Sequence, residues 1–198
     1  MSNAASLPVG VILAGGSGTR LADKAGSTVG GVPIIQRVLN ALRPACGSML
    51  LVVGQRQEWP GVGIPQVHDE FSGCGPLAGI HAALKATGQP CFVVACDMPF
   101  LDSGLIRYMV RQGGGREAVV PFVRGRYEPL HALYSPQCLT PIEESLGRGN
   151  LKVADLFPRL RVRQISEEEI RRFGEPEVLF FNVNTPEELE LANQRAGR

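Results

Sequence analysis

The sequence predicts an α/β fold in three layers, α/β/α, with a mostly parallel sheet between two layers of helices. Short apolar runs that resemble buried strands alternate with amphipathic, helix-like segments along the chain. The strand-like runs are nearly continuous in apolar residues, which is typical of parallel strands covered on both faces. At 198 residues, 44% of them hydrophobic, the chain can form one domain with a sizeable core.

The first half of the chain predicts three strands and two helices. Residues 9–13, VGVIL, form an apolar run that leads into a glycine loop, and they predict the first strand. The helical spacing of apolar residues over 34–42 predicts a helix, and 49–53 predicts a second strand. A short strand over 66–68 is expected next, followed by a helix over 76–86.

The run 91–96, CFVVAC, is the most apolar of the chain and predicts the central strand. Ser103 predicts the N-cap of a helix that ends near Arg111, and two further strands are expected at 118–122 and 130–134. The remaining chain predicts two helices, an edge strand, a last strand and a last helix, over 136–146, 152–157, 161–165, 178–183 and 186–194. Thr185 and Glu188 form a capping-box pattern at the start of the last helix, with Pro186 in its first position.

Composition excludes several classes of protein. We expect a single domain over 6–198, because residues 1–5, MSNAA, resemble the remnant of a cloning tag. A net charge of +1 without blocks of like charge argues against a nucleic-acid partner, and no apolar run approaches the roughly 18 residues of a membrane span. The five cysteines contain no C-x-x-C pair, so we expect reduced thiols in a cytoplasmic protein and no zinc site.

The stretch LAGGSGTRLADK, residues 13–24, is the most informative of the chain. Its glycines expose backbone N–H groups to which phosphates can come close, and Arg20 and Lys24 add two cations. It is neither a P-loop, since Gly18 is followed by Thr19-Arg20, nor a dinucleotide fingerprint, whose last glycine position holds Leu21. The pattern predicts a polyphosphate site, and a flexible turn with solvated charges is the alternative.

Two aspartates follow predicted strands, and ligands bind at the carboxyl ends of such strands. We therefore expect the loops after Leu13, His68 and Cys96 to lie together. Asp97 would hold Mg²⁺ beside the phosphates, or else cap the turn before a proline. Asp69 could accept hydrogen bonds from the N1–H and N2–H₂ groups of guanine, or lie exposed in its loop.

Two more segments complete the predicted site. Gly75-Pro76-Leu77 opens a helix and offers a rigid wall with N–H groups for a base or ribose. Asn182 and Asn184 lie in FFNVNTPEEL, and strand alternation would place both amides on one face. The capping box does not explain these amides, which can bind a pterin edge, a phosphate or a metal.

These parts are consistent with nucleotidyl transfer to a phosphorylated acceptor. A phosphate oxygen is already anionic at pH 7, so the attacking group needs no dedicated base, and none of the three histidines lies in a catalytic pattern. Catalysis would come from alignment and charge stabilisation by Mg²⁺, Arg20, Lys24 and backbone N–H groups.

The motifs LAGGSGTR–DK, GPLAG, CDMP, EPLHALY and NVNTPEEL occur in the order typical of the molybdenum cofactor guanylyltransferases, which the chain resembles from Val9 to Leu191. The resemblance implies a Rossmann-like nucleotidyltransferase fold with a mixed, mostly parallel sheet. It also implies transfer of GMP from GTP to molybdopterin, giving molybdopterin guanine dinucleotide and pyrophosphate. Other proteins of molybdenum cofactor biosynthesis or apo-molybdoenzymes would be its partners.

The resemblance assigns roles to residues of this chain. GTP would be bound by the following residues: Leu13, Ala14, Gly15, Gly16, Lys24, Asp69, Gly75, Pro76, Leu77 and Asp97. Asp97 would hold the metal, Arg20 would face the departing pyrophosphate, and Asn182 and Asn184 would lie on the acceptor side.

Part of the opening loop departs from the family pattern. Lys24 follows Arg20 one residue sooner than is usual, and Gly26, Ser27 and Thr28 stand where the family has apolar residues and proline. Two alternatives follow for function. One is another nucleotidyltransferase of the superfamily, transferring a cytidylyl group to molybdopterin or a nucleotidyl group to a sugar or phospho-acid. The other is a nucleotide-binding regulator without catalysis.

Overall fold

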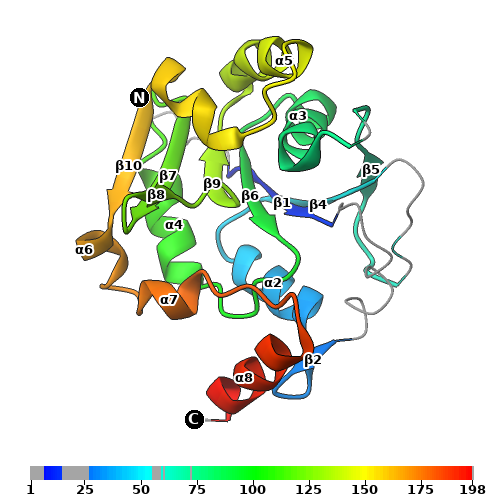
Figure 1. The fold of residues 1–198 in the computed structure, drawn as a ribbon, viewed down its shortest axis with the longest axis vertical. Coiled ribbons are helices and arrows are strands. Elements are labelled where there is room, and N and C mark those ends of the chain that lie inside the picture. Colours follow the sequence, from blue (N-terminus) through cyan, green and yellow to red (C-terminus); the bar gives the residue numbers. More distant parts are fainter. Residues whose placement is uncertain (1–6, 15–26, 55–58, 60, 72, 198) are drawn as a thin grey trace.

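The computed structural model describes residues 7–197 apart from 15–26, 55–58, 60 and 72. Within these residues eight strands form one sheet, in which β8 pairs with β7 and the other seven follow the order β10-β7-β9-β6-β1-β4-β5 (Figure 1). The strands are β1 (Val9–Leu13), β4 (Ser48–Val53), β5 (Gln66–His68), β6 (Cys91–Ala95), β7 (Ala118–Val123), β8 (Arg126–Tyr127), β9 (His131–Tyr134) and β10 (Val162–Ser166). The most apolar strand, β6, is fully buried at the middle of this order, as predicted.

The sheet is mixed but mostly parallel. β6, β1, β4 and β5 run in one direction, and β10 runs parallel to β7. β9 is antiparallel to both β6 and β7. Because the two reversals cancel, β7 points the same way as β6, and the carboxyl ends of both strands lie at the same edge of the sheet. Two strands that β9 separates in this order therefore present their following loops at one edge of the sheet.

Helices cover both faces of the sheet, which confirms the three-layer fold (Figure 1). One face packs against α2 (Ile34–Leu42), α4 (Ser103–Arg111), α6 (Glu167–Ile170) and α7 (Pro176–Leu179). The other face packs against α3 (Gly75–Thr87), α5 (Leu139–Gly147) and the 3₁₀ helices η1 (Pro136–Cys138) and η2 (Val153–Arg159). Successive side chains of each strand point to opposite faces of the sheet and contribute to the two cores in turn. Each layer of helices therefore covers a different set of strand residues.

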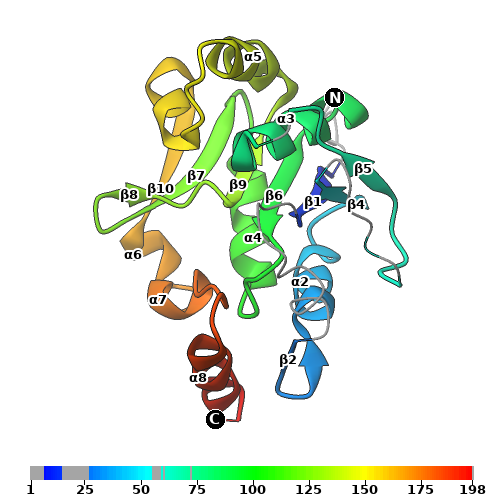
Figure 2. The ribbon, with the colours of Figure 1, turned by 45° about the vertical axis from the view of Figure 1, so that its right-hand side comes forward.

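A small hairpin and the last helix lie side by side beyond the sheet (Figures 1 and 2). The hairpin consists of β2 (Thr28–Val29) and β3 (Val32–Pro33), and the helix is α8 (Pro186–Ala196). Gly30 and Gly31 have φ of 60° and 75°, the combination that a two-residue type I′ turn requires. Strands this short carry no periodic pattern, so the sequence does not predict the hairpin.

Three predicted elements need correction. The expected strand over 178–183 is wrong, because Pro176 starts α7 there and the following residues have no strand partner. Its apolar residues instead pack under the sheet: Phe180 is 8% exposed and belongs to the core. The N-cap of α4 is Asp102, whose carboxylate accepts from the backbone N–H of Leu105 at 2.8 Å, and Ser103 is the first helical residue. The helix expected over 152–157 is the 3₁₀ helix η2.

Other local predictions are confirmed. The capping box at the start of α8 is present, with Thr185 accepting from the N–H of Glu188 and Glu188 from that of Thr185. The segment 136–146 is helical but divides into η1 and α5. The five cysteines, all of them described, remain thiols.

In the described part of the chain, no helix has the length and apolar character that crossing a bilayer requires.

Candidate active site

The carboxyl ends of three neighbouring strands are joined by backbone hydrogen bonds. The N–H of Cys96 donates to the carbonyl of Leu13 at 3.1 Å, and the N–H of Ala14 donates to Val52 at 2.8 Å. One strand further along, the N–H of Asp69 donates to the carbonyl of Val53 at 3.1 Å. The starts of the loops after Leu13, His68 and Cys96 therefore lie along one edge, as predicted.

Asp97 lies near the centre of this edge, two residues beyond β6. Its Oδ1 atom is buried, and its backbone carbonyl accepts a hydrogen bond from the N–H of Val183 at 2.9 Å. Within the described residues no group of three or more His, Cys, Asp or Glu side chains could hold a metal ion. A single carboxylate suits Mg²⁺, which usually keeps several waters and takes substrate phosphates as ligands. The donor set therefore fits a metal that arrives with a nucleotide.

Asp69 follows β5, which lies on the other side of β4 from β1. Its Oδ1 atom is buried and has no hydrogen-bond partner among the residues that the structure describes. Burial raises the pKa of the Asp69 carboxyl, an effect that neighbouring His68 partly offsets. A buried acceptor without a donor is costly, so a ligand that brings N–H groups to this oxygen would be stabilised there.

The first turn of α3 faces the same edge. Cys74, at the N-cap, provides no side-chain cap, and Gly75 has a φ of 64°. Gly75 and Pro76 are exposed, but Leu77 is completely buried in the core. The Leu13 side chain is also buried, and its Cδ2 atom would lie 3.0 Å from a Cβ atom on Gly79. Leu13 and Leu77 can therefore meet a nucleotide only through their backbones.

Part of the predicted site lies outside the described residues. Gly15, Gly16, Arg20 and Lys24, with the rest of the segment 15–26, belong to this part. The described chain resumes at Ser27, whose carbonyl accepts from the N–H of Ile34 at 3.0 Å. The assignments of the glycine loop and its two cations stay predictions.

The two asparagines do not share the face of a strand, so the reason given for their pairing is wrong. Asn182 donates from Nδ2 to the carbonyl of Phe180 at 3.1 Å, and the N–H of Asn184 donates to Glu188 at 2.6 Å. The hydrogen bond from Val183 to the Asp97 carbonyl nevertheless brings this motif to the predicted metal position. Asn182 and Asn184 therefore lie near Asp97 because of a backbone hydrogen bond, and not because they alternate on one face of a strand.

Arg37 is a residue of this region that the sequence does not reveal. From α2, its Nε atom donates to the carbonyl of Pro99 at 2.9 Å and its Nη1 atom to that of Val29 at 3.2 Å. The guanidinium also lies 5.6 Å from the ring centroid of Phe100. Arg37 therefore joins the loop after Asp97 to the hairpin that follows the glycine segment. In the sequence it is one arginine on an amphipathic helix, with nothing to distinguish it from a solvated one.

Asn193 holds the same hairpin from the other side. Its Oδ1 atom accepts from the N–H of Gly30 at 3.0 Å, and its Nδ2 atom donates to the carbonyl of Thr28 at 3.3 Å. Its partners lie more than 160 residues earlier in the chain, so no local pattern could have predicted the contact. Arg37 and Asn193 together hold the hairpin that follows the glycine segment in the sequence.

Two of the three histidines, His81 and His131, are buried. His131 is completely buried between the rings of Phe92 and Phe180, at centroid distances of 5.3 and 5.1 Å. Neither of its ring nitrogens has a hydrogen-bond partner among the described residues. Burial lowers the pKa of His131 to about 3, so the ring is neutral at pH 7.

Comparison with known proteins points to one family. Residues 10–163 match the family described as the MobA-like NTP transferase domain. The chain is 43% identical over 196 residues to the probable molybdenum cofactor guanylyltransferase of Pelotomaculum thermopropionicum, covering 96% of each chain. It is 37% identical over 198 residues to the molybdenum cofactor guanylyltransferase of Desulfosudis oleivorans, again covering 96% of each chain.

A solved structure shows the same likeness. The molybdopterin-guanine dinucleotide biosynthesis protein A of Archaeoglobus fulgidus superimposes with a TM-score of 0.78 at 28% identity, covering 96% of this chain and 98% of that one. The nucleotidyltransferase fold predicted from the motifs is confirmed by this match.

Proposed function

The chain belongs to the MobA-like NTP transferase family, and from that membership we propose that it transfers GMP from GTP to the terminal phosphate of molybdopterin. A phosphate oxygen of the acceptor attacks the α-phosphorus of GTP and forms the new P–O bond. The bond between the α-phosphorus and the bridging oxygen breaks, and its electron pair leaves with pyrophosphate. Both named relatives described above, over nearly their full length, support this choice of base and acceptor.

One observation carries the proposal at the level of the site. The hydrogen bond from Val183 to the Asp97 carbonyl brings the NVNT segment to the carboxyl end of β6. We assign Asp97 to the triphosphate side and Asn182 and Asn184 to the acceptor side of the reacting phosphorus. A carboxylate and two amide side chains then lie on either side of the position at which the new bond forms.

We infer that Mg²⁺ binds with the nucleotide at Asp97, where it would neutralise charge on the phosphates. Asp69 accepts hydrogen bonds from the guanine edge, and the uncapped N–H groups of α3 contact the nucleotide beside it. Arg20 and Lys24 bind the phosphates. The protein's contribution is to align the two phosphates and to stabilise developing charge, since the attacking oxygen carries no proton to remove.

We further propose that the reaction takes place in the cytoplasm, which the five cysteine thiols support. The acceptor would come from, and the product go to, other proteins of molybdenum cofactor biosynthesis or apo-molybdoenzymes.

Release of pyrophosphate tests the proposal. The protein is incubated with molybdopterin, Mg²⁺ and either GTP, CTP, UTP or ATP, and the dinucleotide product is identified by mass. We expect pyrophosphate with GTP and molybdopterin together and none with GTP alone. Faster turnover with CTP would replace the guanylyl assignment by cytidylyl transfer, and a product only with a sugar phosphate would reject the acceptor. Nucleotide binding without turnover on any acceptor would favour the regulator.

A further inference from the structure

An open cleft of about 420 Å³ lies between the β7–β8 hairpin and α7. Arg124, Arg126 and Glu128 line it from the hairpin and the residue after it, and Glu177 and Phe180 line it from α7 and the chain beyond. The nucleotide assignments above leave this cleft unused.

The cleft lies at the same edge of the sheet as Asp97. β7 ends at Val123 and points the same way as β6, which ends at Ala95. Phe180, which lines the cleft, is followed three residues later by Val183, whose N–H bonds the Asp97 carbonyl. Three residues span at most about 10 Å. This reach is comparable with the length of a pterin that carries a short phosphate-bearing side chain.

The cleft and the proposed base position lie on opposite sides of Asp97. In the strand order β10-β7-β9-β6-β1-β4-β5, Asp69 follows β5 at one end, and the cleft adjoins β7 near the other end. Asp97 follows β6 in the middle. A donor on the β5 side and an acceptor on the β7 side would meet at Asp97 without competing for the same wall.

Two opposite charges line the cleft without neutralising each other. Among the described residues, none forms a hydrogen bond or ion pair with the side chains of Arg126 or Glu128. Arg126 is exposed, whereas Glu128 is half-buried. Burial raises the pKa of the Glu128 carboxyl. A partly buried carboxylate without donors is unfavourable, and ligand N–H groups would compensate it.

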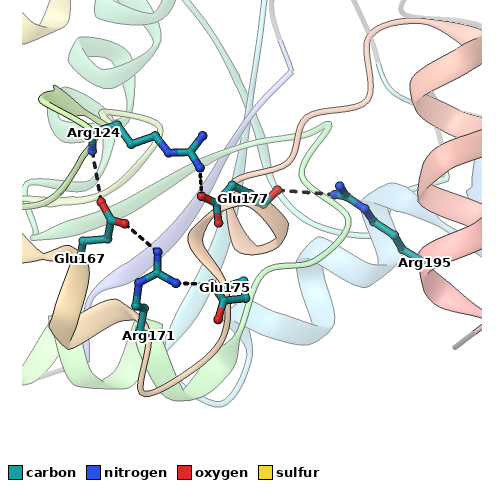
Figure 3. Close-up of polar contacts among 6 residues, drawn as sticks. All are labelled: Arg124, Glu167, Arg171, Glu175, Glu177 and Arg195. Carbon is teal, nitrogen blue, oxygen red and sulfur yellow. Dashed lines mark hydrogen bonds and ion pairs between the residues drawn. The ribbon is translucent and has the colours of Figure 1, made fainter.

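One ion pair and two hydrogen bonds hold the walls of the cleft (Figure 3). Arg124 donates from its backbone N–H to Glu167 at 3.4 Å and pairs through its guanidinium with Glu177. Arg195, from α8, donates to the carbonyl of Glu177 at 3.5 Å. Arg124 has a φ of 50° and Gly125 one of 76°, so the hairpin turn is narrow and holds a non-glycine residue in an unfavourable region. These contacts hold the hairpin against α7.

We propose that this cleft binds the 2-amino-4-oxo-pyrimidine edge of the acceptor's pterin, an inference that rests on the proposed function. The Glu128 carboxylate accepts from the ring N–H and the 2-amino group, as carboxylates do with this donor pair. Arg126 donates to the 4-oxo group, and Phe180 provides an apolar side. Arg124 is held by Glu177 and acts on the shape of the cleft.

The first test separates the two substrates. In Glu128→Gln the charge and one of two equivalent acceptors are lost, so the KM for molybdopterin should rise about 10- to 100-fold. The KM for GTP should stay unchanged. Glu168→Gln, which removes the same charge from an exposed residue of α6 outside the cleft, is the control. An unchanged KM for molybdopterin in Glu128→Gln would overturn the inference while GMP transfer by the wild type still upheld the proposed function.

The second test does not depend on turnover. Free pterin is titrated by its fluorescence, up to millimolar protein, against the wild type, Glu128→Gln and Glu168→Gln. Saturable binding that Glu128→Gln abolishes supports the cleft, even if the wild type fails to use molybdopterin. Lumazine, which has an oxo group in place of the 2-amino group, should bind more weakly. No saturation by the wild type, or equal binding to all three proteins, would reject the cleft as a pterin site.

Folding of the variant is a further check. Burial already disfavours the charged form of Glu128, so the neutral glutamine should leave the unfolding temperature unchanged or raise it. A raised KM in a fully folded variant then reports on the ligand.

Discussion

The backbone N–H of Val183 donates to the carbonyl of Asp97 at 2.9 Å. This bond joins residues 86 positions apart and brings an asparagine-containing segment to the carboxyl end of the central strand. The attachment is made by the backbone of Asp97 and not by its carboxylate. Side-chain substitutions at Asp97 should therefore affect chemistry more than architecture.

Asp97→Asn should abolish Mg²⁺-dependent turnover and leave the fold intact. The amide keeps the size of the side chain but loses the charge that holds a divalent cation among phosphates. Turnover is measured against Mg²⁺ concentration, with circular dichroism as the folding control. Turnover near that of the wild type at saturating Mg²⁺ would reject Asp97 as a metal ligand.

Asn182→Ala should raise the KM for molybdopterin more than that for GTP. Asn182 lies between Phe180, which lines the cleft, and Val183, and we assign it to the acceptor side of Asp97. Asn184→Ala should act in the same direction. The two KM values are measured separately for each variant. A selective loss of GTP affinity would place these amides on the nucleotide side instead.

Arg37→Met should lower kcat with little change in fold. The methionine keeps much of the apolar stem but loses the hydrogen bonds to Pro99 and Val29, so the Asp97 loop and the hairpin are no longer joined. We expect a drop of about 10-fold, since hydrogen bonds from a charged donor contribute roughly 1.5–3 kcal/mol. A higher Mg²⁺ requirement should accompany it.

The control is Arg43→Met at the carboxyl end of the same helix, where the exposed side chain donates to Asn40 at 3.1 Å and has no other hydrogen-bond partner among the described residues. Equal effects of the two substitutions would mean that Arg37 acts through general stability and does not position the site.

Asn193→Ala should destabilise the protein and weaken GTP use together. It removes the hydrogen bonds to Gly30 and Thr28, which we expect to cost about 1 kcal/mol, or roughly 2–4 °C in unfolding temperature. The KM for GTP should rise because the hairpin follows the predicted phosphate segment. Asn40→Ala, on exposed surface, is the matched control, and an unaltered KM in a destabilised Asn193→Ala would confine Asn193 to a structural role.

Glu169 should make stability depend on acid. Burial alone would raise the pKa of this carboxyl, but hydrogen bonds from Tyr108, Ser166 and Arg163 outweigh it and lower the pKa to about 2. The contribution of Glu169 is therefore present above about pH 4.5 and is lost as the pH falls towards 2. The free energy of unfolding of the wild type should exceed that of Glu169→Gln at pH 7, and this difference should be smaller at pH 3. A difference that does not change with pH would contradict the linkage. Glu168→Gln is the control.

The parts of the fold that the sequence predicts are those whose patterns are local. The apolar run of β6 and the capping box of Thr185 and Glu188 need no distant partner to be recognised. The strand predicted over 178–183, which is wrong, shows the limit of such patterns. Phe180 and Phe181 pack against the core without belonging to a strand. An apolar run indicates burial, but it does not show whether a strand partner exists.

The same limit applies to the site. Asp69 and Asp97 could be placed at one edge because each follows a strand, and the carboxyl ends of parallel strands lie at the same edge of a sheet, where ligands bind. Arg37 and Asn193 could not, since their significance lies in carbonyl and amide groups of segments far away in sequence. The sequence also does not predict that Arg126 and Glu128 line a cleft, because the cleft forms between the hairpin and α7, which are distant in sequence.

The position of β9 has a consequence for the order in which the protein is made. β9 lies between β6 and β7, so these strands cannot be bridged until residues 131–134 have left the ribosome. The hydrogen bonds from Val183 to Asp97 and from Gly30 to Asn193 can form only later, when residues 183 and 193 have been synthesised. A nascent chain would thus have most of its sheet before it has a complete catalytic edge. The segment around Val183 and the helix α8, which are synthesised last, therefore complete this edge.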